Sequence, residues 1–232
     1  MSTQLKLDSQ SVIQTKHLCK SYGDKDTLVK ALDDVTLDVK RGEFSAIVGP
    51  SGSGKSTLLQ MIGGLDESDS GEIFLAGNNI ADLSSSALTQ YRRDHIGFIF
   101  QSYNLIPVLS AAENVEYIML LQGIDKAERK ERTFEILKQV GLIGRENRRP
   151  GQLSGGQQQR VAVARAMVSK PDIILADEPT ANLDSKTGVE LLDMMKELNE
   201  VHNMTFLFST HDPKIMDRAS RLIKMVDGKL TK

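Results

Sequence analysis

The stretch Gly49-Pro50-Ser51-Gly52-Ser53-Gly54-Lys55-Ser56 decides the fold of this chain. It matches the P-loop pattern, in which two glycines enclose four residues and are followed by Lys and by Ser or Thr. The apolar residues 44–48 before it predict a buried strand, and residues 56–62 after it predict a helix that ends at Gly63-Gly64. Strand, glycine-rich turn and helix are the context that this motif requires. The stretch therefore predicts a loop that wraps a phosphate chain.

The residue types in this loop each have a chemical reason. Glycines let the backbone turn so that successive N–H groups point inward at the phosphates, and the helix N-terminus adds partial positive charge. Lys55 supplies a point charge for the outer phosphates, and the Ser56 hydroxyl can ligate Mg²⁺. The residues expected to bind the nucleotide here are Gly49, Pro50, Ser51, Gly52, Ser53, Gly54, Lys55, Ser56 and Thr57.

The composition excludes several classes of protein. The 232 residues carry a net charge of −2, which gives no bulk electrostatic case for nucleic-acid binding. A single cysteine, Cys19, excludes an internal disulfide and a cysteine-based metal cluster. No apolar run reaches the roughly 18–20 residues that cross a bilayer, and the polar N-terminus lacks the apolar core of a signal peptide. We therefore expect a cytosolic protein whose membrane role, if it has one, comes through a partner.

The pattern along the chain predicts one domain with an insertion. Residues 1–11 are polar and predict a tail, and residues 12–232 predict the domain itself. The first part of the domain is rich in strand patterns and predicts an antiparallel sheet. Residues from about 102 to 165 are dominated by helical patterns and predict a helical subdomain.

Turn residues and alternating elements complete this prediction. Turns are expected at residues 21–23, at Asp33-Asp34 and at Asp227-Gly228, where the last one joins two short strands in a hairpin. In the C-terminal half, strand and helix patterns alternate, which predicts a parallel sheet covered by helices.

A second nucleotide motif follows at residues 173–178, where four apolar residues precede two acids. In a parallel sheet the carboxyl ends of the strands lie along the edge where ligands bind. Asp177 is therefore expected to hold Mg²⁺, directly or through water, and Glu178 to polarise the attacking water. The alternative is a buried strand that happens to meet a charged turn, which the presence of the P-loop disfavours.

A third motif, residues 153–157, is the most discriminating feature of the sequence. Ser154 at a helix start, followed by Gly155, Gly156 and Gln157, predicts a second phosphate-binding helix N-terminus. The P-loop already wraps the phosphates of one nucleotide. A second site of this kind makes sense if it closes over a nucleotide held by another copy of the chain.

Taken together, these motifs resemble those of the ATP-binding subunit of an ATP-binding cassette (ABC) transporter. The resemblance covers the chain from about residue 12 to its end, through Tyr22, residues 49–56, Gln101, residues 153–157, residues 173–178, residues 182–184 and His211. It implies an α/β fold: a P-loop NTPase core on a mixed sheet, an N-terminal antiparallel β-subdomain and an inserted α-helical subdomain. It also implies ATP and Mg²⁺ as ligands.

The resemblance further implies individual roles. Tyr22 would stack on adenine, Gln101 would contact Mg²⁺ or water and hinge the helical subdomain, and His211 would contact the γ-phosphate. Asp184 would link the two active sites of a dimer in which two subunits pack head to tail with two ATP between them. The residues implied to be catalytic are Glu178, His211, Gln101 and Lys55. Those implied to ligate the metal are Ser56, Gln101 and Asp177. Those implied to act on the partner's nucleotide are Ser154, Gly155, Gly156, Gln157 and Asp184.

Three segments, residues 96–107, 149–160 and 175–184, are similar to a narrower group of lipoprotein-release, macrolide-export and cell-division ATPases (LolD, MacB and FtsE). Ala181 departs from the glycine expected in that group. The similarity implies a subunit at the cytoplasmic face of the inner membrane whose dimer closure moves an integral-membrane permease. It also implies that the permease docks on the helical insertion, especially residues 103–117.

Other functions stay open at this point. One is an FtsE-like ATPase that controls a cell-envelope complex without transporting a solute, and a less favoured one is an ABC ATPase without a transport role. A P-loop kinase or GTPase is disfavoured, because the sequence lacks an Asn-Lys-x-Asp motif and such enzymes have no use for residues 153–157. A regulatory subunit that only binds ATP is disfavoured because all the expected catalytic side chains are present.

Overall fold

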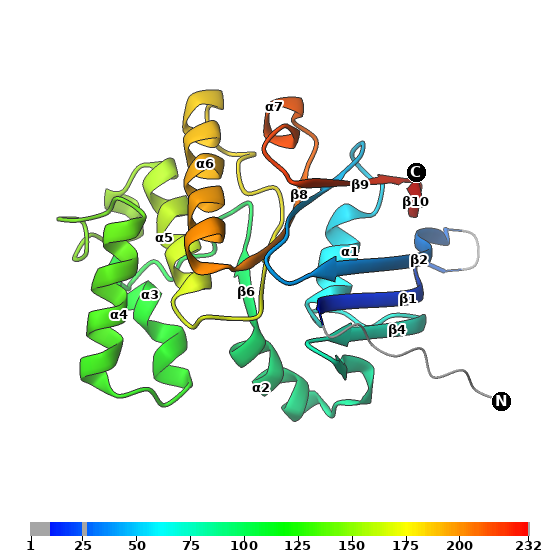
Figure 1. Ribbon diagram of the computed structural model, residues 1–232, viewed down its shortest axis with the longest axis horizontal. Coiled ribbons are helices and arrows are strands. Elements are labelled where there is room, and N and C mark those ends of the chain that lie inside the picture. Colours follow the sequence, from blue (N-terminus) through cyan, green and yellow to red (C-terminus); the bar gives the residue numbers. More distant parts are fainter. Residues whose placement is uncertain (1–9, 25–26, 232) are drawn as a thin grey trace.

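The molecule is built on two β-sheets in the computed structural model, which describes residues 10–24 and 27–231 (Figure 1). The first sheet is antiparallel, with strand order β2-β1-β4-β5, and the second has the order β10-β9-β3-β8-β7-β6. The strands are β1 (Ser11–Tyr22), β2 (Val29–Lys40), β3 (Phe44–Val48), β4 (Ser70–Leu75), β5 (Asn78–Asn79), β6 (Ile96–Ile99), β7 (Ile173–Ala176), β8 (Thr205–Thr210), β9 (Arg221–Val226) and β10 (Lys229–Thr231). Most of the predicted tail, residues 1–9, lies outside the described residues.

Most of the helices lie at the left of the molecule in Figure 1, and the antiparallel sheet lies at the right, together with the first helix. The helices are α1 (Lys55–Ile62), α2 (Ser85–His95), α3 (Ala111–Leu121), α4 (Lys126–Gln139), α5 (Gly155–Met167), α6 (Ser185–His202) and α7 (Pro213–Met216), with short 3₁₀ turns at Ile80–Asp82 and Pro150–Gln152. Side chains of the residue before the helix accept backbone N–H bonds at the starts of α2, α3, α5 and α6, from Ser84, Ser110, Ser154 and Asp184. The expected α/β fold with an antiparallel sheet and a mixed sheet is confirmed.

The antiparallel sheet corrects two of the expected turns. β2 runs without a break through Asp33-Asp34, and β1 extends to Tyr22, which pairs with Val29. The pairing of β1 with β2 is irregular here, and Asp34 takes a left-handed conformation (φ 58°) opposite His17 (φ 48°). The Nδ1 atom of His17 lies 2.6 Å from Oδ1 of Asp34. A bulge therefore absorbs the acidic pair that sequence patterns interpret as a turn.

The mixed sheet brings together the strands that carry the three motifs. β3 pairs in parallel with β8 and with β9, and β7 pairs in parallel with β8 and with β6. The final pair, β9 and β10, forms the predicted hairpin, in which Asp227 (φ 47°) and Gly228 (φ 77°) are both left-handed. Because parallel strands end at the same edge, the segments that follow β3, β6, β7 and β8 meet there.

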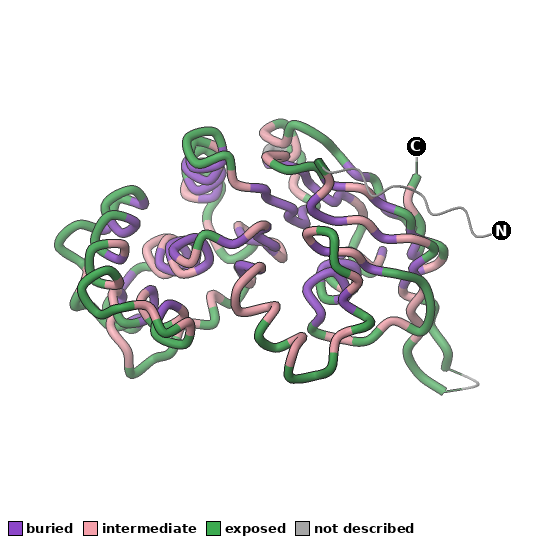
Figure 2. Tube along the Cα trace, turned by 60° about the horizontal axis from the view of Figure 1, so that its bottom comes forward, coloured by how far each residue is buried: buried purple, intermediate pink, exposed green. Residues whose placement is uncertain are grey.

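The hydrophobic core has two parts, one on each face of the mixed sheet. Successive residues of β8 contribute to opposite parts, since Phe206 and Phe208 face one cluster and Leu207 faces the other. The first cluster continues into α3, where Val115 and Met119 are fully buried. Figure 2 shows buried positions along the central strands and the inner sides of the helices. The boundaries of the helical subdomain, about 102–165, stay a prediction, because the sheet and α3 share one core.

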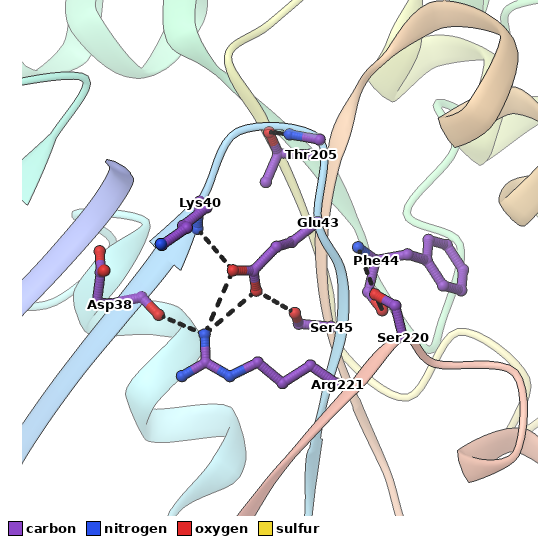
Figure 3. A network of polar contacts seen from close by, with 9 residues as sticks. Asp38, Lys40, Glu43, Phe44, Ser45, Thr205, Ser220 and Arg221 are labelled. Atoms are coloured by element: carbon purple, nitrogen blue, oxygen red, sulfur yellow. Dashed lines mark hydrogen bonds and ion pairs between the residues drawn. The ribbon is translucent and has the colours of Figure 1, made fainter. Parts of the chain in front are cut away.

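A polar network fixes the amino end of β3, the strand that leads into the P-loop (Figure 3). The Glu43 carboxylate accepts hydrogen bonds from the Lys40 N–H (3.1 Å) and from the Ser45 hydroxyl (2.6 Å). Arg221, at the start of β9, lies 3.2 Å from the same carboxylate and also donates to the Asp38 carbonyl. One carboxylate thus ties the start of β3 to β2 and β9.

We expect Glu43→Ala to lower the free energy of unfolding by about 1–3 kcal/mol, because it leaves a half-buried set of donors unpaired. Urea denaturation measures this change. The control is Glu72→Ala, whose ion pair with Lys16 (3.6 Å) lies at the surface and contributes at most about 0.5 kcal/mol. Equal losses in the two variants would contradict the importance given to the network.

Candidate active site

The backbone of the P-loop is packed too closely for side chains at two of its glycines. A Cβ atom on Gly49 would lie 2.0 Å from the Met225 carbonyl oxygen, and one on Gly54 would lie 2.3 Å from the Ala31 carbonyl oxygen. Gly54 is also left-handed (φ 100°), and it is the cap residue of α1. Glycine is therefore required here by the surrounding protein as well as by the close approach of a phosphate.

The C-terminal hairpin supports this loop from behind. The Gly228 N–H donates to the Ser53 carbonyl (3.0 Å), and the Gly228 carbonyl accepts from the Asp33 N–H (2.9 Å). Because a peptide unit is planar, holding the Ser53 carbonyl toward the hairpin turns the Gly54 N–H the opposite way, into the loop. The hairpin thus helps to aim a phosphate-binding N–H group. Sequence patterns predict the turn at Gly228 but not this contact.

Lys55 lies inside the loop that it follows. Its side chain is buried, and the ammonium donates to the carbonyls of Gly49 and Pro50, both at 2.9 Å. An ammonium held by two carbonyls of the loop places a positive charge where a phosphate chain would lie. Its role in binding the outer phosphates stays a prediction.

Oxygen atoms from three elements converge beside the start of α1. The Ser56 hydroxyl donates to Oδ1 of Asp177 (2.9 Å), and the Ser209 hydroxyl donates to the same oxygen (2.7 Å). Ser209 also accepts the N–H of Glu178 (2.9 Å). Ser209 therefore binds the Asp177 carboxylate and the Glu178 backbone. Sequence reasoning missed it, although a polar residue at the end of the apolar run 206–208, on the ligand-binding edge, was a usable signal.

The two groups expected near the γ-phosphate are in direct contact. Nδ1 of His211 lies 3.0 Å from Oε1 of Glu178. Glu178 is left-handed (φ 44°), which turns its side chain out of the line of β7. A cavity of about 150 Å³ lies beside the pair, with Thr180, Asp184 and Thr210 among its lining residues. The Glu178 carboxylate, which can act as a base, the polar His211 ring and a cavity that can hold water therefore lie side by side.

Gln101 lies two residues after the end of β6, at the edge of the mixed sheet, and it is exposed. Its carbonyl accepts a hydrogen bond from the Asn182 amide (2.9 Å). Asn182 belongs to the loop that leads to Asp184, so this bond joins the two segments. The sequence motif includes Asn182, but sequence reasoning gave it no individual role.

The third motif lies in a different environment. Ser154 and Gln157 form a reciprocal capping box at the start of α5. Added Cβ atoms would lie 2.9 Å from the Tyr103 hydroxyl at Gly155 and 2.6 Å from Thr187 at Gly156. None of the hydrogen bonds found among the described residues joins residues 153–157 to the P-loop. The motif is therefore packed against the segment after Gln101 and against α6.

Asp184 has a clear structural function within its own chain. Its carboxylate accepts the N–H groups of Lys186 (3.1 Å) and Thr187 (3.0 Å) and the Thr187 hydroxyl (2.6 Å) at the start of α6. These bonds, led by the Thr187 hydroxyl, hold the pKa of Asp184 below its usual value. Its expected action toward a second copy of the chain stays a prediction.

Tyr22 is the last residue of β1 and is 40% exposed. Its hydroxyl donates to Oδ2 of Asp66 (2.8 Å). The pKa of the Tyr22 hydroxyl is raised, chiefly because the group is partly buried and secondly because it donates a hydrogen bond to Asp66. A hydrogen bond with Thr57 of α1 has the opposite effect on this pKa. An exposed aromatic ring near the P-loop helix suits stacking on a base.

The oxygen ligands present suit Mg²⁺. Mg²⁺ prefers hard oxygen donors and is usually held by one or two carboxylates together with substrate phosphates and water. The Ser56 hydroxyl and the Asp177 carboxylate lie 2.9 Å apart beside the phosphate loop and provide such donors. Within residues 10–24 and 27–231 there is no group of three or more His, Cys, Asp or Glu that could hold a metal ion by itself.

Comparison with known proteins identifies the family. The family model described as "ABC transporter" matches residues 32–181, well over half of the chain. The chain belongs to the ABC transporter family. The predicted family, fold class and ATP-hydrolysing activity are thereby confirmed.

Relatives of this ABC cassette fall into two groups by length. It is 46% identical to the macrolide export ATP-binding/permease protein MacB of Bradyrhizobium diazoefficiens over 95% of the cassette, which spans only 34% of that relative. It is 44% identical to the uncharacterized ABC transporter ATP-binding protein YbbA of Escherichia coli K12, covering 97% of the cassette and 98% of the relative. The predicted resemblance to the MacB group is therefore confirmed.

Solved structures agree with this assignment. The ATP-binding cassette MJ0796, in a dimeric post-hydrolysis state bound to ADP and Pi, matches with a TM-score of 0.87 and 44% identity, over 95% of this cassette and 97% of that chain. MJ0796 comes from Methanocaldococcus jannaschii. The cassette cbiO1 of Clostridium perfringens matches with the same TM-score at 29% identity, over 96% of this cassette and 88% of that chain.

We expect Ser209→Ala to lower kcat for ATP hydrolysis about tenfold while changing KM for ATP less than about threefold, because it removes a bond to the Asp177 carboxylate. Steady-state ATPase kinetics measure both constants. The control is Ser220→Ala, which removes a hydroxyl that binds Phe44 at the opposite end of β3. Equal loss of kcat in the control would show that Ser209 acts only through stability.

Proposed function

We propose that this ABC cassette hydrolyses ATP as a head-to-tail homodimer and thereby drives a separate membrane subunit. The observation that carries the proposal is the division of the phosphate-binding groups. The P-loop, Asp177, Glu178 and His211 meet at one edge of the mixed sheet, whereas residues 154–157 are packed elsewhere, against Tyr103 and Thr187. A second copy would supply the missing wall of each nucleotide site.

In this proposal each group has one task. The P-loop N–H groups and Lys55 bind the phosphates, and the Tyr22 ring stacks on adenine. Glu178 accepts the proton of the attacking water, and His211 binds the γ-phosphate while it holds the Glu178 carboxylate in place. Ser154, Gly155, Gly156 and Gln157 bind the γ-phosphate of the nucleotide held by the other copy, and Asp184 contacts the facing site.

The metal has a defined place in this proposal. Ser56, Asp177 and Gln101 would hold Mg²⁺, directly or through water. When bound, Mg²⁺ neutralises charge that develops on the β- and γ-phosphate oxygens. The hydrogen bonds of Ser56 and Ser209 to Asp177 keep its carboxylate turned toward this place.

The membrane subunit would dock on the segment after Gln101 and on α3. Val108 is 71% exposed, and Ile106 and Tyr117 are also exposed, whereas Leu105 packs against the core. Apolar side chains that gather at a surface in this way often mark an interaction site. No helix among the described residues is long and apolar enough to span a membrane. In this proposal the subunit is peripheral, at the cytoplasmic face of the inner membrane.

The type of work done is the finer part of the proposal. One group of relatives is named as a macrolide export ATP-binding/permease protein, and this supports a permease of the mechanical type that moves lipoproteins or macrolides. The alternative is an FtsE-like ATPase that controls a cell-envelope complex and transports no solute. Both need the same dimer, and they differ only in the membrane partner.

We expect Glu178→Gln to lower ATP turnover at least about a hundredfold, because the amide cannot accept the proton of the attacking water. The variant should form a stable dimer with ATP, measured by size-exclusion chromatography, while the chain without nucleotide stays monomeric. Glu200→Gln, exposed near the end of α6, is the control and should hydrolyse ATP normally. Unchanged ATPase activity of Glu178→Gln would refute the role of Glu178.

We expect Val108→Glu to abolish recovery of an integral-membrane partner when the tagged full chain is purified from membranes of its source cells. The variant should still bind ATP, since Val108 lies outside the nucleotide site. Val201→Glu is a matched control, because Val201 is 69% exposed on α6, a different element. Recovery of the unmodified chain without any integral-membrane partner would contradict the proposed function.

A further inference from the structure

A single carboxylate lies at the centre of the contacts around Tyr22. Oδ2 of Asp66 accepts the Tyr22 hydroxyl (2.8 Å), and Oδ1 of Asp66 accepts the Lys20 ammonium (3.4 Å). Asp66 lies in the loop that leads from α1 to β4, whereas Tyr22 and Lys20 lie on β1. The two oxygens of one side chain therefore bind two different groups of the strand.

Lys20 occupies one face of the Tyr22 ring. Its ammonium lies 5.0 Å from the centre of the ring, and its side chain is only 12% exposed. A further bond from the ammonium to the Glu67 carbonyl (2.6 Å) fixes this position. A nucleotide base can then stack only on the opposite face of the ring.

The backbone of β1 is bound to the same loop. The Ser21 N–H donates to Oδ2 of Asp69 (2.6 Å), and the Asp69 N–H donates to the Cys19 carbonyl (3.0 Å). These bonds hold the strand and the loop at a fixed distance from each other. These two bonds attach only the backbone of β1 to the loop, whereas the bond from the Tyr22 hydroxyl to Asp66 attaches the ring itself.

We propose that Asp66 is a positioning residue for the nucleotide base, because it holds the Tyr22 ring in the orientation that stacks on adenine. This inference rests on the proposed function, in which Tyr22 is the stacking residue. Tyr22 is 40% exposed at the end of a strand, so without an anchor its ring would rotate between several conformers. An anchored ring is organised before the nucleotide arrives, and it loses less conformational entropy on binding.

The anchor also relates the two halves of the nucleotide site. Asp66 follows the helix whose first turn carries Lys55 and Ser56. The Tyr22 ring is thereby attached to the segment that continues from the phosphate loop. Asp66 would keep the base platform at the right distance from the phosphate site, and its effect should depend on the base.

The test compares binding of MgADP with binding of magnesium pyrophosphate, which has no base, by isothermal titration calorimetry on the full chain. ADP is chosen because it is not hydrolysed. Asp66→Ala should weaken MgADP about three- to tenfold, the usual effect of one lost hydrogen bond, and change pyrophosphate affinity less than about twofold. Glu67→Ala, which removes the neighbouring exposed carboxylate, is the matched control and should bind MgADP normally.

A double-mutant cycle separates positioning from a general structural effect. Tyr22→Phe keeps the ring and removes the hydroxyl, so adding Asp66→Ala to it should cause no further loss of MgADP affinity. Two independent, fully additive losses would overturn the inference, as would equal weakening of MgADP and pyrophosphate.

A further variant, Tyr22→Ala, distinguishes this inference from the function on which it rests. If Tyr22→Ala leaves MgADP affinity unchanged, the stacking role of Tyr22 is wrong, and the inference falls with it. If Tyr22→Ala weakens MgADP but Asp66→Ala does not, stacking stands and only the positioning role of Asp66 is overturned.

Discussion

The conformation of the phosphate loop depends on how closely other segments approach its backbone. The carbonyls of Met225 and Ala31 occupy the space that side chains at Gly49 and Gly54 would need, and the Gly228 N–H holds the Ser53 carbonyl. These contacts come from β9, β2 and the C-terminal hairpin turn, so the loop has its shape only when both sheets are assembled. A site that binds phosphate through backbone N–H groups needs such support, because the glycines that make the loop possible also make it flexible.

The order of the strands then places the chemistry around this loop. Since β3, β8 and β7 are neighbours, the residues that follow them meet as a row at one edge of the sheet. Ser209 at the end of the middle strand touches both acids that follow β7, and Ser56 reaches one of them from α1. Two hydroxyls of the protein thus orient the Asp177 carboxylate, and one of them also holds the Glu178 backbone.

Several parts of this arrangement follow from local sequence patterns. The P-loop, the helix start at Ser154 and the hairpin at Asp227-Gly228 are each specified by a few consecutive residues, and the structure has them where expected. The turn predicted at Asp33-Asp34 is wrong, because β2 continues through both residues. An acidic pair favours turns when only local propensity is considered, but the pairing of β1 with β2 absorbs it in a bulge. Long-range strand pairing here outweighs local preference.

The sequence by itself determined the kind of site, because short motifs such as residues 49–56 and 173–178 encode backbone shape and ligand type in adjacent positions. Tertiary structure alone decided which groups support that site. Ser209 contacts Asp177, which is 32 positions away in the sequence. Gly228 contacts Ser53 at a separation of 175 positions, and Asp66 contacts Tyr22 at a separation of 44. No local sequence pattern contains these contacts. Such partners become visible only when strands and loops distant in the chain are packed side by side, since a hydrogen bond depends on spatial distance and not on sequence separation.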